Sequence, residues 1–186
     1  MPRRAGTQAG ADAADAGGVV VHPLPPLFVP DSRVLLLGSM PSPKSREVQF
    51  FYGHPQNRFW PVIAGLWGEP VPAGNTVEEL NAARRELCLR HRIALWDVLA
   101  SCRIVGASDA SITEAVPNDL SRILDACDIR QIFCTGSAAG SYYRKLIEPE
   151  LGRPCVVLPS TSPANARWRL PQLIEAWAPV REAAES

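Results

Sequence analysis

Short runs of mainly apolar residues recur along the chain at residues 33–38, 93–96, 129–134 and 155–158. A strand with one exposed face alternates apolar and polar residues, whereas a strand covered on both faces reads as a nearly continuous apolar run. The four runs therefore predict four short strands of one sheet that is covered on both faces.

Stretches with apolar residues at helical spacing separate these predicted strands. Thr76 and Glu79 form a capping-box pattern at the start of a helix. Asn118 is a favourable N-cap for a second helix, a third is predicted over residues 137–147, and Pro171 suits the first turn of a last one. Because strands and helices alternate, the predicted fold is α/β: a three-layer α/β/α sandwich around a short, mainly parallel four-stranded sheet.

Ligands of such sheets bind beyond the carboxyl ends of the strands. The segments that follow Gly38, Trp96, Thr135 and Leu158 are therefore where a functional site is expected.

The length of 186 residues suits one domain with a full core. Residues 1–22 are predicted to be a disordered tail, because the start of the chain is rich in Ala, Gly and Asp. A single domain is predicted over residues 23–186. It begins with an extended arm from Pro23 to Phe28, which is too rich in proline for a helix or a central strand.

Charge and composition narrow the function classes. Lys and Arg together number 19, as do Asp and Glu, so the net charge is zero and a nucleic-acid partner needs a local basic patch. No apolar run is long enough to span a membrane, and the start lacks an apolar export signal. The five cysteines form no CxxC pair, which favours reduced thiols, no metal site and a cytoplasmic protein.

The segment that follows the predicted strand ending at Gly38 is rich in aromatic rings. Six aromatic side chains, counting His54, fall within residues 50–60, interleaved with Gly53, Pro55 and polar residues. Aromatic rings on an irregular loop beside polar groups are typical of a slot in which a flat ring stacks. A satellite hydrophobic cluster under a long loop explains the same pattern equally well.

The segment at residues 158–166 is a proline-containing polar turn with little side-chain bulk, followed by Arg167 and Arg169. A stiff loop flanked by guanidinium groups suits insertion into a nucleic-acid groove while the arginines hold phosphates. A helix-capping loop with surface arginines is the alternative from the residues alone.

Together these segments resemble a known family. Gly38-Ser39-Met40-Pro41-Ser42, the string FYGHPQNRFW at residues 51–60 and LPSTSPAN at residues 158–165 are similar to motifs of the uracil-DNA glycosylase superfamily. They most resemble its hypoxanthine-DNA glycosylase branch, often called the sixth family. The resemblance runs from about Arg33 to Trp177 and also covers residues 95–99 and 106–112. It implies a glycosylase-like α/β fold and a base-excision repair enzyme, a DNA-deoxyinosine glycosylase in the first place. Such an enzyme hydrolyses the bond between a deaminated base, here hypoxanthine, and deoxyribose, without metal or cofactor.

The resemblance also implies roles for individual residues. The first motif offers no acid, so the catalytic role passes to Asn57, which can orient water or hydrogen-bond to the substrate. Either Phe51 or Tyr52 stacks on the base, with Phe51 preferred. The base pocket is assigned to Gly38, Ser39, Met40, Pro41, Phe51, Tyr52, His54, Thr135 and Gly136. The loop that contacts DNA is assigned to Ser160, Ser162, Pro163, Ala164, Asn165 and Arg167.

One departure leaves the substrate open. The family often has Asn where this chain has Thr135, at a place suited to reading the base edge. A hydroxyl both donates and accepts, so recognition is less strict, and hypoxanthine, uracil and xanthine all remain candidates. The partner is expected to be double- or single-stranded DNA bound by a monomer.

Three other functions compete with this one. A uracil or mismatch glycosylase has the same fold, and a nucleic-acid-binding module would keep the fold without catalysis. A serine hydrolase with Ser39 or Ser42 as nucleophile is disfavoured, because the chain has no GxSxG elbow and only three histidines.

Overall fold

A computed structural model describes residues 18–186 of the protein. Its central sheet contains four parallel strands in the order β3-β2-β6-β7. This confirms the predicted short parallel sheet. The strands are β2 (Val34–Gly38), β3 (Ile93–Asp97), β6 (Gln131–Thr135) and β7 (Val156–Leu158).

The complete burial of β2 and β3 explains why their sequences are continuous apolar runs. Every residue of β2 and β3 is buried, so neither strand has a solvent-facing side. The register pairs Gly38 with Asp97 and Thr135 with Leu158, so neighbouring strands end nearly level. Level ends leave one continuous edge on which loops can build a site.

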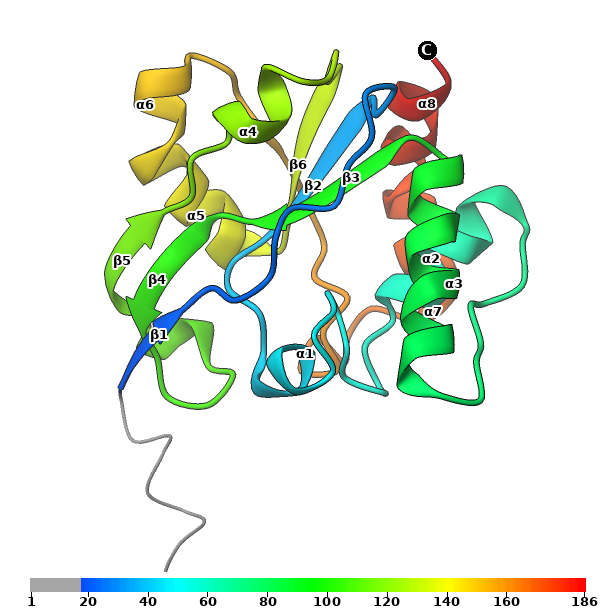
Figure 1. Ribbon diagram of the computed structural model, residues 1–186, viewed down its shortest axis with the longest axis horizontal. Helices are drawn as coiled ribbons and strands as arrows, with labels where there is room; N and C mark the ends of the chain where they lie inside the picture. Colours follow the sequence, from blue (N-terminus) through cyan, green and yellow to red (C-terminus); the bar gives the residue numbers. More distant parts are fainter. Residues whose placement is uncertain (1–17) are drawn as a thin grey trace, which may run out of the picture.

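Helices cover both faces of this sheet, which confirms the three-layer sandwich (Figure 1). One group lies on one side: α4 (Ser121–Leu124), α5 (Ser137–Leu146) and α6 (Glu148–Leu151). The opposite side carries α2 (Phe59–Trp67), α3 (Val77–Arg90), α7 (Leu170–Ala176) and α8 (Ala178–Glu185). The short α1 (Pro43–Glu47) follows β2 at the carboxyl edge.

Three of the four predicted helix starts are confirmed, and one is wrong. The helix α5 begins at Ser137, and Pro171 lies in the first turn of α7, which α8 follows. Thr76 caps α3 by accepting a hydrogen bond from the Glu79 N–H at 3.1 Å, while the Glu79 carboxylate accepts from Asn75 N–H at 2.8 Å. Asn118 does not cap a helix. Its amide instead donates to the carbonyls of Asp97 and Leu99, the two residues that flank Val98. The helix that follows, α4, begins only at Ser121.

A second sheet was not predicted. It is antiparallel, in the order β1-β4-β5, and contains β1 (Val19–Val21), β4 (Leu99–Arg103) and β5 (Thr113–Pro117). Residues 19–22 therefore do not belong to a disordered tail, since β1 pairs with β4. The other residues assigned to that tail, 1–17, lie outside the described part.

The proline-rich arm lies across the domain as predicted. Leu24 and Leu27 are buried, and Leu27 exchanges backbone hydrogen bonds with Leu95 in β3 at 2.8 and 2.9 Å. Over residues 18–186, no helix has the length and apolar character needed to cross a membrane.

Candidate active site

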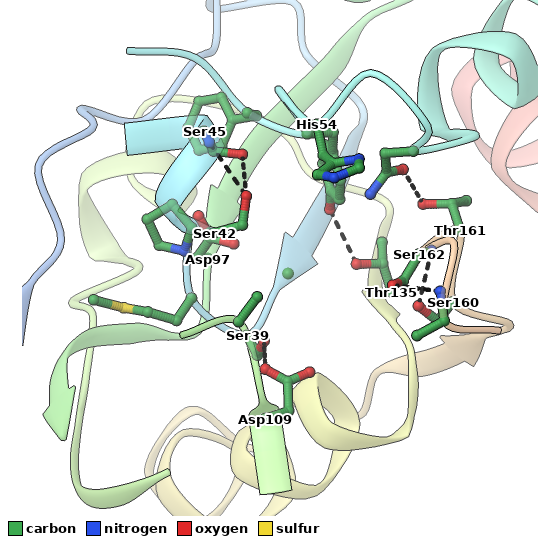
Figure 2. Close-up of a pocket in the computed structure, with 18 of the residues that line it drawn as sticks. Ser39, Ser42, Ser45, His54, Asp97, Asp109, Thr135, Ser160, Thr161 and Ser162 are labelled. Atoms are coloured by element: carbon green, nitrogen blue, oxygen red, sulfur yellow. Dashed lines mark hydrogen bonds between the residues drawn. The ribbon is translucent and has the colours of Figure 1, made fainter. Parts of the chain in front are cut away.

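A cavity of about 330 Å³ opens at the carboxyl edge of the parallel sheet. This volume lies in the range of small-molecule sites, about 300–1,000 Å³. The end residues of three strands form its floor: Gly38, Asp97 and Thr135. Figure 2 shows Asp97 on one side of the cavity, Thr161 on the other and Asp109 below them. The remaining lining residues are Ser39, Met40, Pro41, Ser42, Ser45, Phe51, Tyr52, His54, Asn57, Ala107, Ser160, Ser162, Pro163 and Ala164.

Tyr52 enters the cavity from a strained turn. Its φ of 49° lies in the left-handed region, which costs a residue with a Cβ about 1–2 kcal/mol. The ring stacks on Phe59 with a centroid distance of 3.7 Å, and the phenol lies 3.0 Å from the Thr135 hydroxyl. Burial raises the pKa of Tyr52, and nearby Asp97 raises it further, so the phenol stays protonated. These contacts offset the strain and fix Thr135.

The aromatic segment forms a hydrophobic cluster and also contributes two residues to the cavity lining. Phe50, Phe59 and Trp60 are buried and pack edge-on or tilted against one another, which makes them part of the core. Phe51 is also buried but lines the cavity, as does Tyr52. The segment is therefore a hydrophobic cluster with one side turned to the cavity.

The side chain of Asn57 is held in one orientation. Its Oδ1 accepts hydrogen bonds from the Phe59 N–H at 2.9 Å and from the Thr161 hydroxyl at 2.8 Å. The Phe59 backbone N–H can only donate, so the amide oxygen and nitrogen cannot exchange places. No described residue hydrogen-bonds to Nδ2, and Asn57 lines the cavity. Asn57 therefore combines a fixed amide orientation with an unpaired Nδ2 group at the cavity lining, which can serve as an N–H donor.

Arg58 holds the loop after β7, which forms one wall of the cavity. The sequence did not indicate this role. Its guanidinium donates to the backbone carbonyls of Thr161 and Ser162, the latter at 2.7 Å. It also donates to the carbonyls of Asn165, at 3.0 Å, and Trp168. One half-buried cation thus holds the whole loop, and through Thr161 that loop holds Asn57.

The loop after β7 is stiffened by its own hydrogen bonds. Asn165 donates through Nδ2 to the Ser160 carbonyl at 2.9 Å, and the Ser162 N–H donates to the Ser160 hydroxyl at 3.2 Å. Pro163 and Ala164 form the exposed tip. Asn165 is thereby half-buried and closes the loop rather than extending from it.

Two carboxyl groups line the cavity, those of Asp97 and Asp109, and neither was among the predicted site residues. Asp97 is 5% exposed and accepts from His22 Nε2 at 2.7 Å. His22 Nδ1 accepts from the Leu24 N–H, which fixes the tautomer with hydrogen on Nε2. Asp97 directly follows Trp96, after which a functional site was expected, so the sequence did point to its position. His22 was missed because it was placed in the tail.

Asp109 reaches the cavity from the 3₁₀ turn η1 (Asp109–Ser111) in the connection between β4 and β5. The Ser39 hydroxyl donates to its Oδ1 at 2.6 Å. Partial burial raises the pKa of the Asp109 carboxyl and Asp97 adds to this, while the hydrogen bond from Ser39 lowers it. No sequence pattern relates this loop to Ser39, because 70 residues separate the two.

Most of the predicted site residues meet at this cavity. Every residue assigned to the base pocket lines it except Gly136, which lies in a second groove beside it together with Asn165 and Arg167. Gly136 has a φ of 101°, a conformation suited to glycine, and its N–H donates to the Leu158 carbonyl. Its role is to turn the chain between β6 and α5.

The hydroxyl groups argue against a serine nucleophile. Ser39 donates to Asp109, and Ser42 interacts with the hydroxyl and N–H of Ser45 at 3.1 and 3.2 Å. Among residues 18–186, no histidine hydrogen-bonds to either serine. A base that activates a serine must be within hydrogen-bond reach of it.

The floor of the cavity has no room for a side chain at Gly38. A Cβ at this position would lie 2.4 Å from Asp97 Oδ1, and Asp97 is itself held by His22. We expect Gly38→Ala to lower the free energy of unfolding by about 1–3 kcal/mol, measured by urea denaturation, through overpacking. Gly18→Ala is the control, since a Cβ there meets nothing within 4 Å. Equal stability of the two variants would contradict the tight floor.

The fold and the cavity define a class: an α/β protein with a fixed amide donor and two carboxyl groups at the carboxyl edge of a parallel sheet. The sequence model of the uracil DNA glycosylase superfamily matches residues 25–181. The chain belongs to this superfamily.

Relatives in that superfamily cover most of the chain. Hypoxanthine DNA glycosylases from Methanosarcina barkeri and Methanosarcina acetivorans are 31% and 30% identical to it over 144 and 145 residues. The matches span 77% of this chain and 87% of each relative. An NMR structure from Methanosarcina acetivorans, of a protein assigned as a uracil DNA glycosylase, superposes with a TM-score of 0.70 at 29% identity. The superposition covers 91% of this chain and 100% of the chain in the NMR structure.

Proposed function

We propose that the protein is a monofunctional DNA-deoxyinosine glycosylase, which hydrolyses the N-glycosidic bond of a flipped-out nucleotide and releases hypoxanthine. The single observation that carries this is the free N–H of Asn57, held inside a cavity of small-molecule size by two hydrogen bonds to its oxygen. The hypoxanthine DNA glycosylases among its relatives support the choice of substrate.

The chemistry needs a donor at this place. As the bond between C1′ and the base nitrogen breaks, negative charge develops on the leaving base and positive charge on the sugar. A preorganised N–H aimed at the base stabilises that negative charge without reorganisation. Asn57 is such a donor, since its other end is anchored by Phe59 and Thr161. Asn57 therefore acts on the leaving base rather than as a base toward water.

The same donor discriminates between bases. Hypoxanthine presents a carbonyl oxygen at O6, whereas adenine presents an amino group there, so adenine would face Asn57 with donor against donor. Uracil also presents a carbonyl beside an N–H. We propose hypoxanthine as the main substrate and uracil as the second candidate, because Thr135, paired with Tyr52, reads the edge with a hydroxyl.

Phe51 is proposed to form the aromatic wall. Tyr52 already has Phe59 stacked on one face of its ring. The neighbours of Phe51 meet its ring tilted or edge-on: Phe50 at 70° and His22 at 46°. In the part of the chain that the structure describes, no ring lies parallel to Phe51, so the flat base completes that arrangement.

DNA is proposed to contact the rim formed by the loop after β7. Its exposed tip, Pro163 and Ala164, lines the cavity mouth, and the exposed Arg167 lines the groove beside it. A small apolar tip fits the gap left by a flipped nucleotide, and an arginine fits the phosphates. This supplies the local basic contact that a chain of zero net charge requires. We propose that a monomer in the cytoplasm binds double- or single-stranded DNA in this way.

Incubation with duplexes that each carry one inosine, uracil or xanthine, or only normal bases, tests the function. Alkali cleaves the abasic site, and a gel shows the product. We expect cleavage of the inosine strand first and none of the normal duplex. Cleavage of uracil alone would assign the chain to the uracil reaction. Intact strands with every lesion would favour a binding module.

A further inference from the structure

Hydrolysis at C1′ needs a group that takes a proton from water, and Asn57 cannot do so. Within residues 18–186, the cavity lining holds three side chains of suitable acid–base character: His54, Asp97 and Asp109. Each can be judged by its hydrogen bonds and by its place relative to the sugar. The sugar stays joined to the DNA backbone and therefore lies nearer the mouth than the base does.

His54 is poorly placed to accept a proton. Its Nδ1 accepts a hydrogen bond from the Gln56 N–H at 3.2 Å, so the neutral ring carries its hydrogen on Nε2. That nitrogen is a donor and has no lone pair to offer. His54 thus resembles Asn57 in presenting an N–H.

Asp97 belongs to the floor. It is 5% exposed, its Oδ2 is bound by His22, and its Oδ1 occupies the space that a Cβ on residue 38 would need. A group this deep faces the base rather than the sugar. His22 Nδ1 accepts from the Leu24 N–H and Nε2 donates to Asp97, so this pair is held together at the base end of the cavity.

Asp109 remains, and its setting suits the task. It lies on an exposed turn yet lines the cavity, and only its Oδ1 is engaged, by Ser39 at 2.6 Å. The turn is itself fixed, because the Ser111 hydroxyl donates to the Ser108 carbonyl at 2.6 Å and accepts from the Val105 N–H at 2.9 Å. Asp109 therefore combines a defined position with a free carboxylate oxygen at the mouth.

Given the proposed glycosylase function, we propose that Asp109 is a catalytic residue that binds the attacking water and receives its proton. The bond from C1′ to the base nitrogen breaks and the base leaves with the electron pair. The water oxygen then bonds to C1′, and one water proton passes to Asp109 Oδ2. The products are an abasic deoxyribose and a free base that takes up a proton. The anionic carboxylate also stabilises the positive charge on the sugar. Ser39 is the positioning residue.

This role implies a dependence on pH. Excision requires the carboxylate, so the rate falls as the pH falls through the Asp109 pKa. Because partial burial raises that pKa, the fall begins at a higher pH than for an ordinary aspartate. The titratable and charged groups that face Asp109 or share its cavity and groove are Asp97 from β3, Cys102 from β4, Tyr142 from α5, Tyr52, His54 and Arg167.

Single-turnover excision of inosine from a duplex, followed from about pH 5 to about pH 9, tests the proposal. We expect Asp109→Asn to slow excision by about 10²-fold to 10³-fold and to abolish the acid limb of the profile. Its dissociation constant for the inosine duplex and its unfolding midpoint should match those of wild type. Asp125→Asn removes an exposed carboxylate outside the cavity lining and should behave as wild type.

Ser39→Ala gives a second, independent readout. The hydrogen bond from Ser39 lowers the Asp109 pKa, so its loss should move the acid limb to higher pH while the rate at high pH is largely kept. If the wild type is active and Asp109→Asn is equally fast at every pH, the role of Asp109 is overturned while the glycosylase function stands. Loss of activity together with loss of duplex binding would also overturn it. A wild type that leaves all lesions intact would overturn the glycosylase function and this role with it.

Discussion

Asn57→Ala should lower the single-turnover rate of inosine excision by about 10²-fold to 10³-fold, because a preorganised donor to the leaving base is lost. The variant also loses the acceptor for the Phe59 N–H at the start of α2 and for the Thr161 hydroxyl. Loss of a cap of this kind lowers the free energy of unfolding by about 1 kcal/mol. Excision kinetics and urea unfolding measure the two effects separately.

Asn57→Asp separates the donor from the anchor. Aspartate keeps an oxygen for Phe59 and Thr161 but puts a carboxylate oxygen where Nδ2 was. We expect stability near that of wild type and a rate loss at least as large as for Asn57→Ala, because the carboxylate also repels the leaving base. If Asn57 instead oriented water through an acceptor, the aspartate variant would stay active, and that result would contradict the proposed role. Asn75→Ala, which removes an exposed amide, is the control.

Arg58→Met should impair both stability and catalysis. Arg58 donates to four backbone carbonyls of the loop after β7, and a hydrogen bond from a charged group contributes about 1.5–3 kcal/mol. We expect the free energy of unfolding to fall by about 2–3 kcal/mol, since the bonds are not additive. Because the loop carries Thr161, which anchors Asn57, kcat/KM should fall by about 10²-fold through misplacement of the amide.

Two further variants serve as controls for Arg58→Met. Arg58→Lys keeps the charge and part of the hydrogen bonding, so it should recover some stability and activity. Arg130→Met removes an exposed arginine paired with Asp128 and should leave excision unchanged. Normal kcat/KM in Arg58→Met would show that the loop holds its shape without the guanidinium, and would sever the proposed link from Arg58 to Asn57.

The sequence alone determined the layers, the parallel sheet and the edge at which the site lies. Continuous apolar runs such as those of β2 and β3 arise only when both faces of a strand are covered, so local pattern reports a global arrangement. The strand exits after Gly38 and Thr135 followed from the same reasoning. Asn57 was reached through the resemblance to a known family, because a lone asparagine carries no pattern of its own.

Tertiary structure decided what those residues do. The Asn57 amide is oriented by Thr161, which is 104 residues away, and Asp109 is held by Ser39 across 70 residues. The antiparallel sheet, with β1 drawn from the presumed tail, and the His22–Asp97 pair likewise depend on contacts between distant segments. Hydrogen bonds of this kind fix a donor or an acid by position in space, and periodicity along a chain carries no record of which distant groups will meet.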